Sequence, residues 1–454
     1  MEWSLWPVVW FTFWQSSLVT TLSIVFGGGL AVIERYNHWR TPNWFLAVAT
    51  LPLFLPALVV GTSFIHLFGN AGDVNALFHW LHLPKLQILY QPSAVILGHL
   101  YYNLPLAYLA MRTALQSLSR HTEESAQTLG ATPWQLLTTV WWPQLRSSVA
   151  GIAAVIFIYC WTSFALPLQL GGSHAKTLEV WLYEQLVLYH HQQLVVIVAL
   201  IQLFMFTVPI VFVWKQQTIH QPHTPSHQTN KHPGLYLLLS GVWLLPLVSL
   251  ISHTMMNWNA TTWSQVQHSE FFPSLITVAA LTIATLLTVV AATHMLRLSA
   301  RWLLILLAIS PITLAGIWLV TIGQGLASLA LAYVFGLLPL AYYFIQERRH
   351  RYGIQYQTAA QTLGANWWQQ RLLEWQWLQP ARNTIIAITV VFIFGDITYS
   401  SLLAPTEHPT TMQVAYGLLS SYRSQAGSLA MCLILLIIIS LQILIYVRNS
   451  KATI

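Results

Sequence analysis

Long uncharged stretches fill most of the chain, with short polar segments between them. A helix that crosses a bilayer needs about 20 predominantly apolar residues, and each stretch is long enough for at least one such helix. The stretch 302–346 is long enough for two helices, with a break near Gly323-Gln324-Gly325, and the stretch 232–269 turns polar after about Leu250. The uncharged windows are 3–33, 41–72, 86–111, 147–175, 185–214, 232–269, 271–296, 302–346 and 424–447, together with 383–406, which only Asp396 interrupts.

This pattern predicts an all-α polytopic membrane protein with about 11 transmembrane helices. The expected spans are residues 8–33, 42–66, 92–111, 148–170, 194–214, 235–252, 273–296, 302–321, 326–346, 382–404 and 428–447.

The composition agrees with a membrane protein. Only 7% of the 454 residues are charged and 56% are hydrophobic, whereas a soluble domain carries about 25% charged residues. The basic residues behind the net charge of +7 are scattered rather than gathered on one face, which argues against nucleic acid as a partner. Both cysteines lie in apolar runs and are expected to be core residues. No cleavable signal peptide is apparent, because the first apolar run lacks a basic start and is long enough to span.

The Lys and Arg residues fall mainly on one side of the threaded chain. Loops on the cytoplasmic side of a membrane carry an excess of these residues. With the polar segment around Glu124 in the cytoplasm, sixteen Lys and Arg residues are cytoplasmic, and only Lys85, Lys176 and Arg423 are outside. The bias predicts an N-terminus outside and a C-terminus in the cytoplasm.

An internal repeat relates the two halves of the chain. The six residues Ala-Gln-Thr-Leu-Gly-Ala occur at 126–131 and again at 360–365, an offset of 234, and Leu-Pro-Leu-Ala-Tyr occurs at 104–108 and 338–342 with the same offset. Upstream the offset becomes 257, so the first half carries roughly twenty extra residues, expected in the outside loop near 67–91.

The repeat divides the chain into residues 1–214 with five helices, a linker at 215–234, and residues 235–454 with six helices. The counterpart of the helix 235–252 would fall before Met1, so the first half is expected to lack a terminal helix, through either loss of the helix or a start site placed too late. The linker contains His220, His223, His227 and His232. Histidine clusters can bind metal, but a linker of this composition is expected to be solvated, and no metal site is predicted.

The repeated polar segments, 121–146 and 355–381, are each expected to form two short helices that project from the bilayer. Gly130 is expected at the turn, because glycine accepts the positive φ that ends a helix. Pro143 is expected near the start of the next helical stretch. Such an element could fit a groove on a soluble partner and move as a rigid body. A surface hairpin without a partner is the alternative, but two copies in one register favour a partner.

These residues resemble the coupling motif of ABC-transporter permeases, Glu-Ala-Ala-x3-Gly. Glu124, Ala126, Gly130 and Pro143 match this motif. The resemblance implies two fused repeats of the ABC importer permease fold in a bacterial inner membrane, two copies of an ATPase subunit that these segments contact, and a periplasmic binding protein. In the second copy, Ala359, Ala360 and Gly364 remain, but Thr358 and Trp377 replace the glutamate and the proline. The second contact is therefore expected to be weaker, or to rely on Arg371 and Glu374.

Further residues narrow the resemblance to the fused two-repeat permeases of bacterial thiamine uptake. Ferric-iron permeases share the two-repeat plan and remain the alternative. The stretch 421–425 favours thiamine or its phosphate esters. The residues that resemble this branch are Tyr102 to Pro105, Trp142 to Arg146, Ser163 to Ala165, Leu170 to Gly172, Thr177 to Glu179, Gly395-Asp396 and Ser421 to Gln425.

Three other residues are candidates for contacts with substrate or binding protein. Asp396 is the only acid well inside an expected span, where a charge should face protein or water. It could lie beside the path of a cationic substrate, or it could serve an internal hydrogen-bonding role. Glu179 and Arg423 lie on expected outside segments and could contact a binding protein, although exposed charges are also common at membrane edges.

Enzyme signatures are missing. Residues 172–177 only imitate a phosphate-binding loop, because they lack the glycine before the lysine. No catalytic residue and no cofactor are predicted in this chain, and ATP is expected to be hydrolysed by a separate subunit. A secondary transporter, which also uses internal repeats, is the alternative from another class. It would contact membrane lipid but no ATPase.

Overall fold

The computed structural model describes residues 5–214, 232–295, 309–421 and 423–451. Within these residues the chain forms helices and no strand, which confirms the expected all-α class. Three of the four linker histidines lie outside the described residues. The chain divides into two compact units. The first contains Met1–Gln185 and Phe204–Met255, and the second contains Leu186–Leu203 and Met256–Ile454.

The helices are apolar and long enough to cross a membrane many times. Seven satisfy the length and hydropathy expected of a span, and two bent helix pairs raise the number to nine within the described residues. Two shorter apolar helices, Gln193–Thr207 and Pro311–Thr321, lie where two further spans are expected. Each expected span therefore has an apolar helix at its position, although the first part of 302–321 lies outside the described residues.

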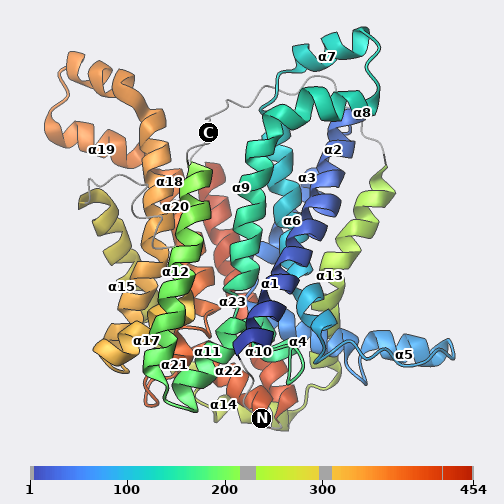
Figure 1. The fold of residues 1–454 in the computed structure, drawn as a ribbon. Coiled ribbons are helices and arrows are strands. Elements are labelled where there is room, and N and C mark those ends of the chain that lie inside the picture. The colour runs from blue at the N-terminus through green and yellow to red at the C-terminus, as the bar shows by residue number, and fades with distance from the viewer. Residues whose placement is uncertain (1–4, 215–231, 296–308, 422, 452–454) are drawn as a thin grey trace. The chain divides into compact units, whose positions relative to one another are not determined.

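The first unit is an antiparallel bundle whose long helices run between the α5 end and the α7 end of the unit (Figure 1). Its interior contains Val19, Ala107, Ile156 and Cys160, all fully or almost fully buried. Its elements are α1 (Leu5–Leu22), η1 (Ser23–Gly28), α2 (Gly29–Tyr36), α3 (Asn43–Thr50), η2 (Leu51–Phe54), α4 (Ala57–Phe68), α5 (Asp73–Trp80), α6 (Pro92–Gln116), α7 (Arg120–Thr128), α8 (Pro133–Gln135), η3 (Leu136–Trp141), α9 (Trp142–Trp161), α10 (Ala165–Leu170), most of α11 (Leu178–Val187) and nearly all of α13 (Pro233–Met256).

Two expected spans of the first unit are interrupted. The helix expected at 42–66 breaks at Leu55, directly before Pro56, and Asn43–Phe54 and Ala57–Trp80 are bent by 106°. Proline cannot donate the backbone hydrogen bond that a continuous helix needs. The Tyr102 hydroxyl donates to the Leu55 carbonyl at 3.0 Å, which satisfies an acceptor that the break leaves open. The helix expected at 148–170 ends instead at Trp161, and the short α10 follows it.

A buried carboxylate ties α13, the first helix after the linker, to the first unit. Glu34 is 4% exposed. Its oxygens accept hydrogen bonds of 2.9 Å from the Tyr108 and Tyr236 hydroxyls and of 3.0 Å from Thr41. Tyr236 lies on α13, and its ring contacts Phe45 on α3. Although α13 follows the linker, it packs with the helices that precede the linker.

The second unit contains a long helix that extends beyond the apolar part of its span. Helix α18 (Leu326–Thr362) has 37 residues, of which Leu326–Gln346 form the candidate span. The expected break near Gly323 is confirmed, since α17 (Pro311–Thr321) ends just before it. The other elements assigned entirely to this unit are α14 (Ala260–Gln267), α15 (Phe271–Met295), α19 (Trp367–Trp377), α20 (Gln379–Phe394), α21 (Ser400–Leu403), α22 (Thr411–Ser420) and α23 (Ser424–Lys451), and α12 (Gln192–Trp214) begins in it.

Candidate functional site

The repeated motif forms a helical hairpin in the first unit (Figure 1). Helix α7 ends at Thr128, and Gly130, two residues later, has a φ of +80°, the left-handed conformation that glycine favours. The Gly130 N–H donates to the Gln127 carbonyl at 2.9 Å, and the Ala131 N–H donates to the Ala126 carbonyl at 3.0 Å. This pattern satisfies the last carbonyls of the helix. The expected glycine turn between two helices is therefore present.

The second copy of the motif ends α18 with the same turn. Gly364 has a φ of +74°. Its N–H donates to the Gln361 carbonyl, and the Ala365 N–H donates to the Ala360 carbonyl, both at 2.9 Å. Every one of these residues is 234 positions after its counterpart. The equivalence of the two hairpins is thus a match of local geometry, found separately in each unit.

Matching hydrogen bonds also begin the helix after each glycine. Thr132 and Gln135 form a capping box, in which each side chain accepts from the backbone N–H of the other. Asn366 and Gln369, again 234 positions later, form the same box. A capping box satisfies two N–H groups that a helix start leaves open. Together, the glycine turn and the box define a compact hairpin from local sequence alone.

A leucine side chain stands at the tip of each hairpin. Leu129, directly before Gly130, is 89% exposed, and Leu363, directly before Gly364, is 86% exposed. An exposed leucine at a tight polar turn offers an apolar knob to a partner surface. Neither leucine was singled out by the motif reasoning, although each lies inside the repeated six-residue stretch and could have been found there.

The base of the first hairpin is held by Glu123 rather than by the motif residue Glu124. Glu123 is 3% exposed, whereas Glu124 is at the surface. One Glu123 oxygen accepts from the Arg35 guanidinium at 2.6 and 2.9 Å and from the Trp141 indole N–H at 3.0 Å. Arg35 lies on α2, and Trp141 ends η3. A buried carboxylate therefore fixes α7 to both the first span and the second helix of the hairpin.

The second helix of this hairpin contains a π-helical turn. Residues 133–161 form one continuous helix, and the wide turn η3 comes directly before Trp142 and Pro143. Such turns are frequent at functional sites and let a helix accept an interruption of its hydrogen bonds. Pro143 is in the first turn of α9, as expected, but α9 continues the helix that precedes it.

The base of the second hairpin is held by a different set of residues. Glu374 accepts from Arg349 on α18 and from Arg371 on α19, both at 2.8 Å. The Arg348 guanidinium lies 4.7 Å from the centre of the Trp377 ring. Arg371 and Glu374, the expected substitutes in this copy, are thus paired with one another.

Trp377, which replaces the proline of the first copy, lies at a bend. Helices α19 and α20 meet at 53° across Leu378, and Pro380 stands in the first turn of α20. The second segment therefore has a broken helix where the first has a continuous helix with a π-helical turn.

Asp396 is enclosed by hydrogen bonds from its own chain. It is 8% exposed. Its Oδ1 accepts from the Thr398 and Tyr399 N–H groups at 2.9 and 3.1 Å, and its Oδ2 accepts from the Ser400 N–H at 2.9 Å and the Tyr333 hydroxyl at 3.0 Å. Four donors suit a carboxylate that fixes the turn into α21. This geometry supports the internal role among the two alternatives, and a place beside a substrate path stays a prediction.

The two residues expected to contact a binding protein have opposite exposures. Glu179 begins α11 and is fully buried, so its carboxylate is not on the surface of the chain. Arg423 is exposed. Neither contact is tested by the structure, and both stay predictions.

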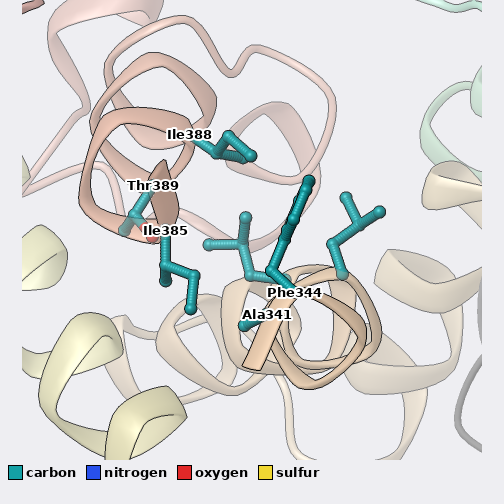
Figure 2. Close-up of a pocket in the computed structure, with 7 residues that line it drawn as sticks. Ala341, Phe344, Ile385, Ile388 and Thr389 are labelled. Atoms are coloured by element: carbon teal, nitrogen blue, oxygen red, sulfur yellow. The ribbon is translucent and has the colours of Figure 1, made fainter. Parts of the chain in front are cut away.

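Small hollows are apolar in both units. In the second unit, α18 and α20 leave a gap lined by Leu337, Leu340, Ala341, Phe344, Ile385, Ile388 and Thr389 (Figure 2). In the first unit, α2 and the α8–η3 segment border an open groove that includes Tyr36, Trp134 and Trp141. Thr389 is the only polar side chain of the first lining, whereas the groove also includes Asn37, and the described residues contain no His, Cys, Asp or Glu cluster suited to a metal ion.

Comparison with known proteins shows which transport proteins this chain is similar to. Residues 23–220 match the family of binding-protein-dependent transport system inner membrane components. The chain is 24% identical to the thiamine transport system permease protein of Haemophilus influenzae over 96% of this chain and 89% of that protein. It is 25% identical to the permease of the same name from Escherichia coli, over 95% and 87% respectively. A stretch covering 40% of the chain is 32% identical to the corresponding protein of Brucella abortus. Residues 23–220 thus match the inner membrane component of binding-protein-dependent transport systems, and nearly the whole chain is similar to multi-pass permeases of ABC transporters.

Proposed function

We propose that this chain is the membrane subunit of an ATP-driven importer of thiamine or its phosphate esters. The relatives that cover nearly all of the chain are named thiamine transport permeases, and the alignments extend over 87–89% of those proteins. Substrate would come from a periplasmic binding protein, and ATP would be hydrolysed by a separate subunit.

The single observation that carries the ATPase contact is the pair of matched hairpins. Each presents an exposed leucine, Leu129 or Leu363, at a turn held by glycine and a capping box. Two such hairpins suit two copies of one ATPase, each with a groove for a helix tip. We place both hairpins in the cytoplasm, with the N-terminus outside and the C-terminus inside, from the distribution of Lys and Arg.

The hairpins would act as levers during transport. Closure of the ATPases around ATP would move the tips, and each rigid hairpin would pass the displacement to the helices at its base. In the first unit this path runs through Glu123 to Arg35 and Trp141. We include Ala126, Pro143, Ala359 and Ala360 in the coupling segments, because they lie in the same matched stretches.

One experiment tests both the substrate and the energy source. The chain would be expressed with its neighbouring ATPase and binding protein in a strain that lacks thiamine uptake, and uptake of labelled thiamine and labelled ferric iron would be compared. We expect thiamine uptake that needs ATP, and an ATPase that co-purifies with the chain. Deletion of 121–146 should abolish both uptake and co-purification while membrane insertion persists. Uptake without an ATPase would support a secondary transporter, and iron uptake alone would support the ferric-iron alternative.

A further inference from the structure

The first unit contains an inserted segment between α4 and α6, here called the excursion, which the second repeat lacks. Between α4 and α6 the chain runs through residues 69–91 and forms the helix α5. The corresponding connection of the second repeat, between α17 and α18, contains only residues 322–325. The excursion is the insertion that the shift in repeat offset indicates. Neither the hairpins nor the proposed transport path uses it.

This excursion has a fixed conformation. The buried Asn75 side chain donates to the Gly69 and Leu86 carbonyls at 2.8 and 3.1 Å and accepts from the Leu86 N–H at 2.8 Å. It thereby joins the start of the excursion, α5 and the returning chain. The Leu83 N–H donates to the Phe78 carbonyl at 2.8 Å, which closes the end of α5. The residues on α5 are therefore held in defined directions.

The excursion is also fastened to the body of the unit. Asp73, in the first turn of α5, accepts from the Ser249 hydroxyl at 2.5 Å and contacts His253 Nε2 at 2.8 Å. Both partners lie on α13. The His253 ring stacks on His66 at the end of α4, with 5.0 Å between centroids. A rigid base holds α5 at the ends of two spans.

Large apolar side chains cover the outward face of α5. Leu77, Trp80 and Leu81 are 52%, 74% and 47% exposed, and they share one helix face by their spacing of three and four residues. Asn75 is turned nearly opposite to Leu77 and is buried. Leu83, directly after the helix, is 48% exposed. A soluble surface would not present such a patch without a partner.

The position of α5 identifies the partner. Helix α5 points sideways out of the first unit, across the direction of the long helices, at the end of the unit opposite α7 (Figure 1). It adjoins the end of the candidate span Pro233–Met256, and it is the last part of Ala57–Trp80, the second half of a bent apolar pair, so it lies at the level of a bilayer surface. Trp and Leu on one face of a helix are typical of segments that lie in the interfacial region of a membrane.

We propose that α5 is an interfacial anchor that inserts Leu77, Trp80 and Leu81 into the phospholipid layer at the bilayer surface opposite α7. In the orientation proposed above this is the outer leaflet. A binding protein would approach along the membrane normal, whereas α5 is directed into the plane where lipid lies. The anchor would hold the ends of α4 and α13 at a fixed depth through Asp73. The proposal needs only that the chain spans the membrane and does not depend on the transported substrate.

Site-directed fluorescence in liposomes tests this anchor. Leu81→Cys would be prepared with Cys160→Ala and Cys432→Ala, labelled with an environment-sensitive dye, and reconstituted into phosphatidylcholine–phosphatidylglycerol vesicles with or without lipids that carry a nitroxide near the headgroup. Leu129→Cys in the same background is the matched control, an equally apolar residue at an exposed turn that we expect in water. Both variants must elute as single species.

We expect the label at Leu81 to emit at shorter wavelength than the label at Leu129. Nitroxide lipids should quench the label at Leu81 at least threefold more strongly than the label at Leu129. Aqueous iodide should quench the label at Leu81 at least threefold less than the label at Leu129. If Leu81→Cys does not fold, the same emission and quenching measurements would be made on Leu77→Cys. Equal iodide quenching at Leu81 and Leu129 without an effect of nitroxide lipids would overturn the proposal. The proposal would also be overturned if the label at Leu81 were protected from iodide only after a purified binding protein is added.

Discussion

Arg35 and Glu123 are 88 positions apart and form a buried ion pair of 2.6 Å that joins the first span to the helix of the first hairpin. The carboxylate also accepts from the Trp141 indole, so Glu123 on α7 contacts two other helical elements, α2 and η3. The second hairpin has Glu374 between Arg349 and Arg371 instead, and Glu374 is more exposed, with a side chain at 16% against 4% for Glu123. The two hairpins thus match at their tips and differ at their bases.

Glu123→Gln should loosen the first hairpin. The change leaves the Arg35 guanidinium buried without its counter-charge, and removal of one partner of a buried pair costs about 3–5 kcal/mol. We expect a lower midpoint of thermal unfolding in detergent and a loss of uptake much larger than the loss of membrane insertion. Glu124→Gln is the control, because its carboxylate is at the surface and its loss should leave the midpoint unchanged. Equal midpoints for the two variants would contradict this role of Glu123.

Gly130→Ala and Gly364→Ala should each strain a hairpin turn. Both glycines have φ near +75° to +80° and no neighbouring atom within 4 Å of an added Cβ, so the strain is conformational and not steric. A left-handed backbone costs a non-glycine residue roughly 1 kcal/mol or more. We expect weaker ATPase co-purification with each variant and no change in expression. Gly130→Asn should restore part of the binding, because asparagine tolerates this conformation. Equal weakening by asparagine and alanine would argue against a backbone cause.

Leu129→Ala should impair ATPase coupling more than Leu363→Ala. The Leu129 and Leu363 side chains are almost equally exposed. The carboxylate at the base of the first hairpin is more deeply buried than that of the second, so the first hairpin should deform less when a force is applied to its tip. Truncation of an exposed interface leucine typically costs about 1 kcal/mol or more only when it is central to the contact. Co-purified ATPase and stimulated ATP hydrolysis would be measured for each variant. A larger effect of Leu363→Ala would reverse the proposed order of the two contacts.

Asp396→Asn separates a structural role from a substrate role. The amide keeps one acceptor oxygen, so up to two of the four donors now on the carboxylate lose their partner, at roughly 1–3 kcal/mol for each unsatisfied buried group. We expect a lower thermal midpoint with an unchanged KM for thiamine in the protein that folds. Tyr333→Phe removes only one hydrogen bond and should have a smaller effect. A changed KM at an unchanged midpoint would instead place Asp396 beside the substrate.

Tyr236→Phe should weaken the attachment of α13 to the first unit. The variant removes one hydrogen bond to the buried Glu34 and keeps the ring contact with Phe45, so the expected loss is about 0.5–1.5 kcal/mol. Glu34→Ala should cost more, because three hydroxyl donors lose their acceptor. Thermal unfolding would compare the two variants. A destabilisation by Tyr236→Phe as large as that by Glu34→Ala would contradict this account.

Much of the hairpin geometry could be predicted, because it depends on local signals. Gly130 and Gly364 provide the left-handed turn, and Thr132 and Asn366 provide the helix start, each from residues within four positions. The break of the second span at Leu55 could also have been predicted, since Pro52 and Pro56 flank it. The tip leucines were missed because the motif directs attention to the glutamate.

The sequence by itself determined the all-α class, the succession of spans and the two hairpin turns, since apolar length and local backbone preference are properties of short segments. Only the tertiary structure decided that Glu123, and not Glu124, is buried. Adjacent helix residues point about 100° apart, and the burying partners Arg35 and Trp141 lie 88 positions before and 18 after. The same holds for Glu34 with Tyr236 and for Asp396 with Tyr333, where packing of distant helices supplies the donors that make a buried carboxylate tolerable.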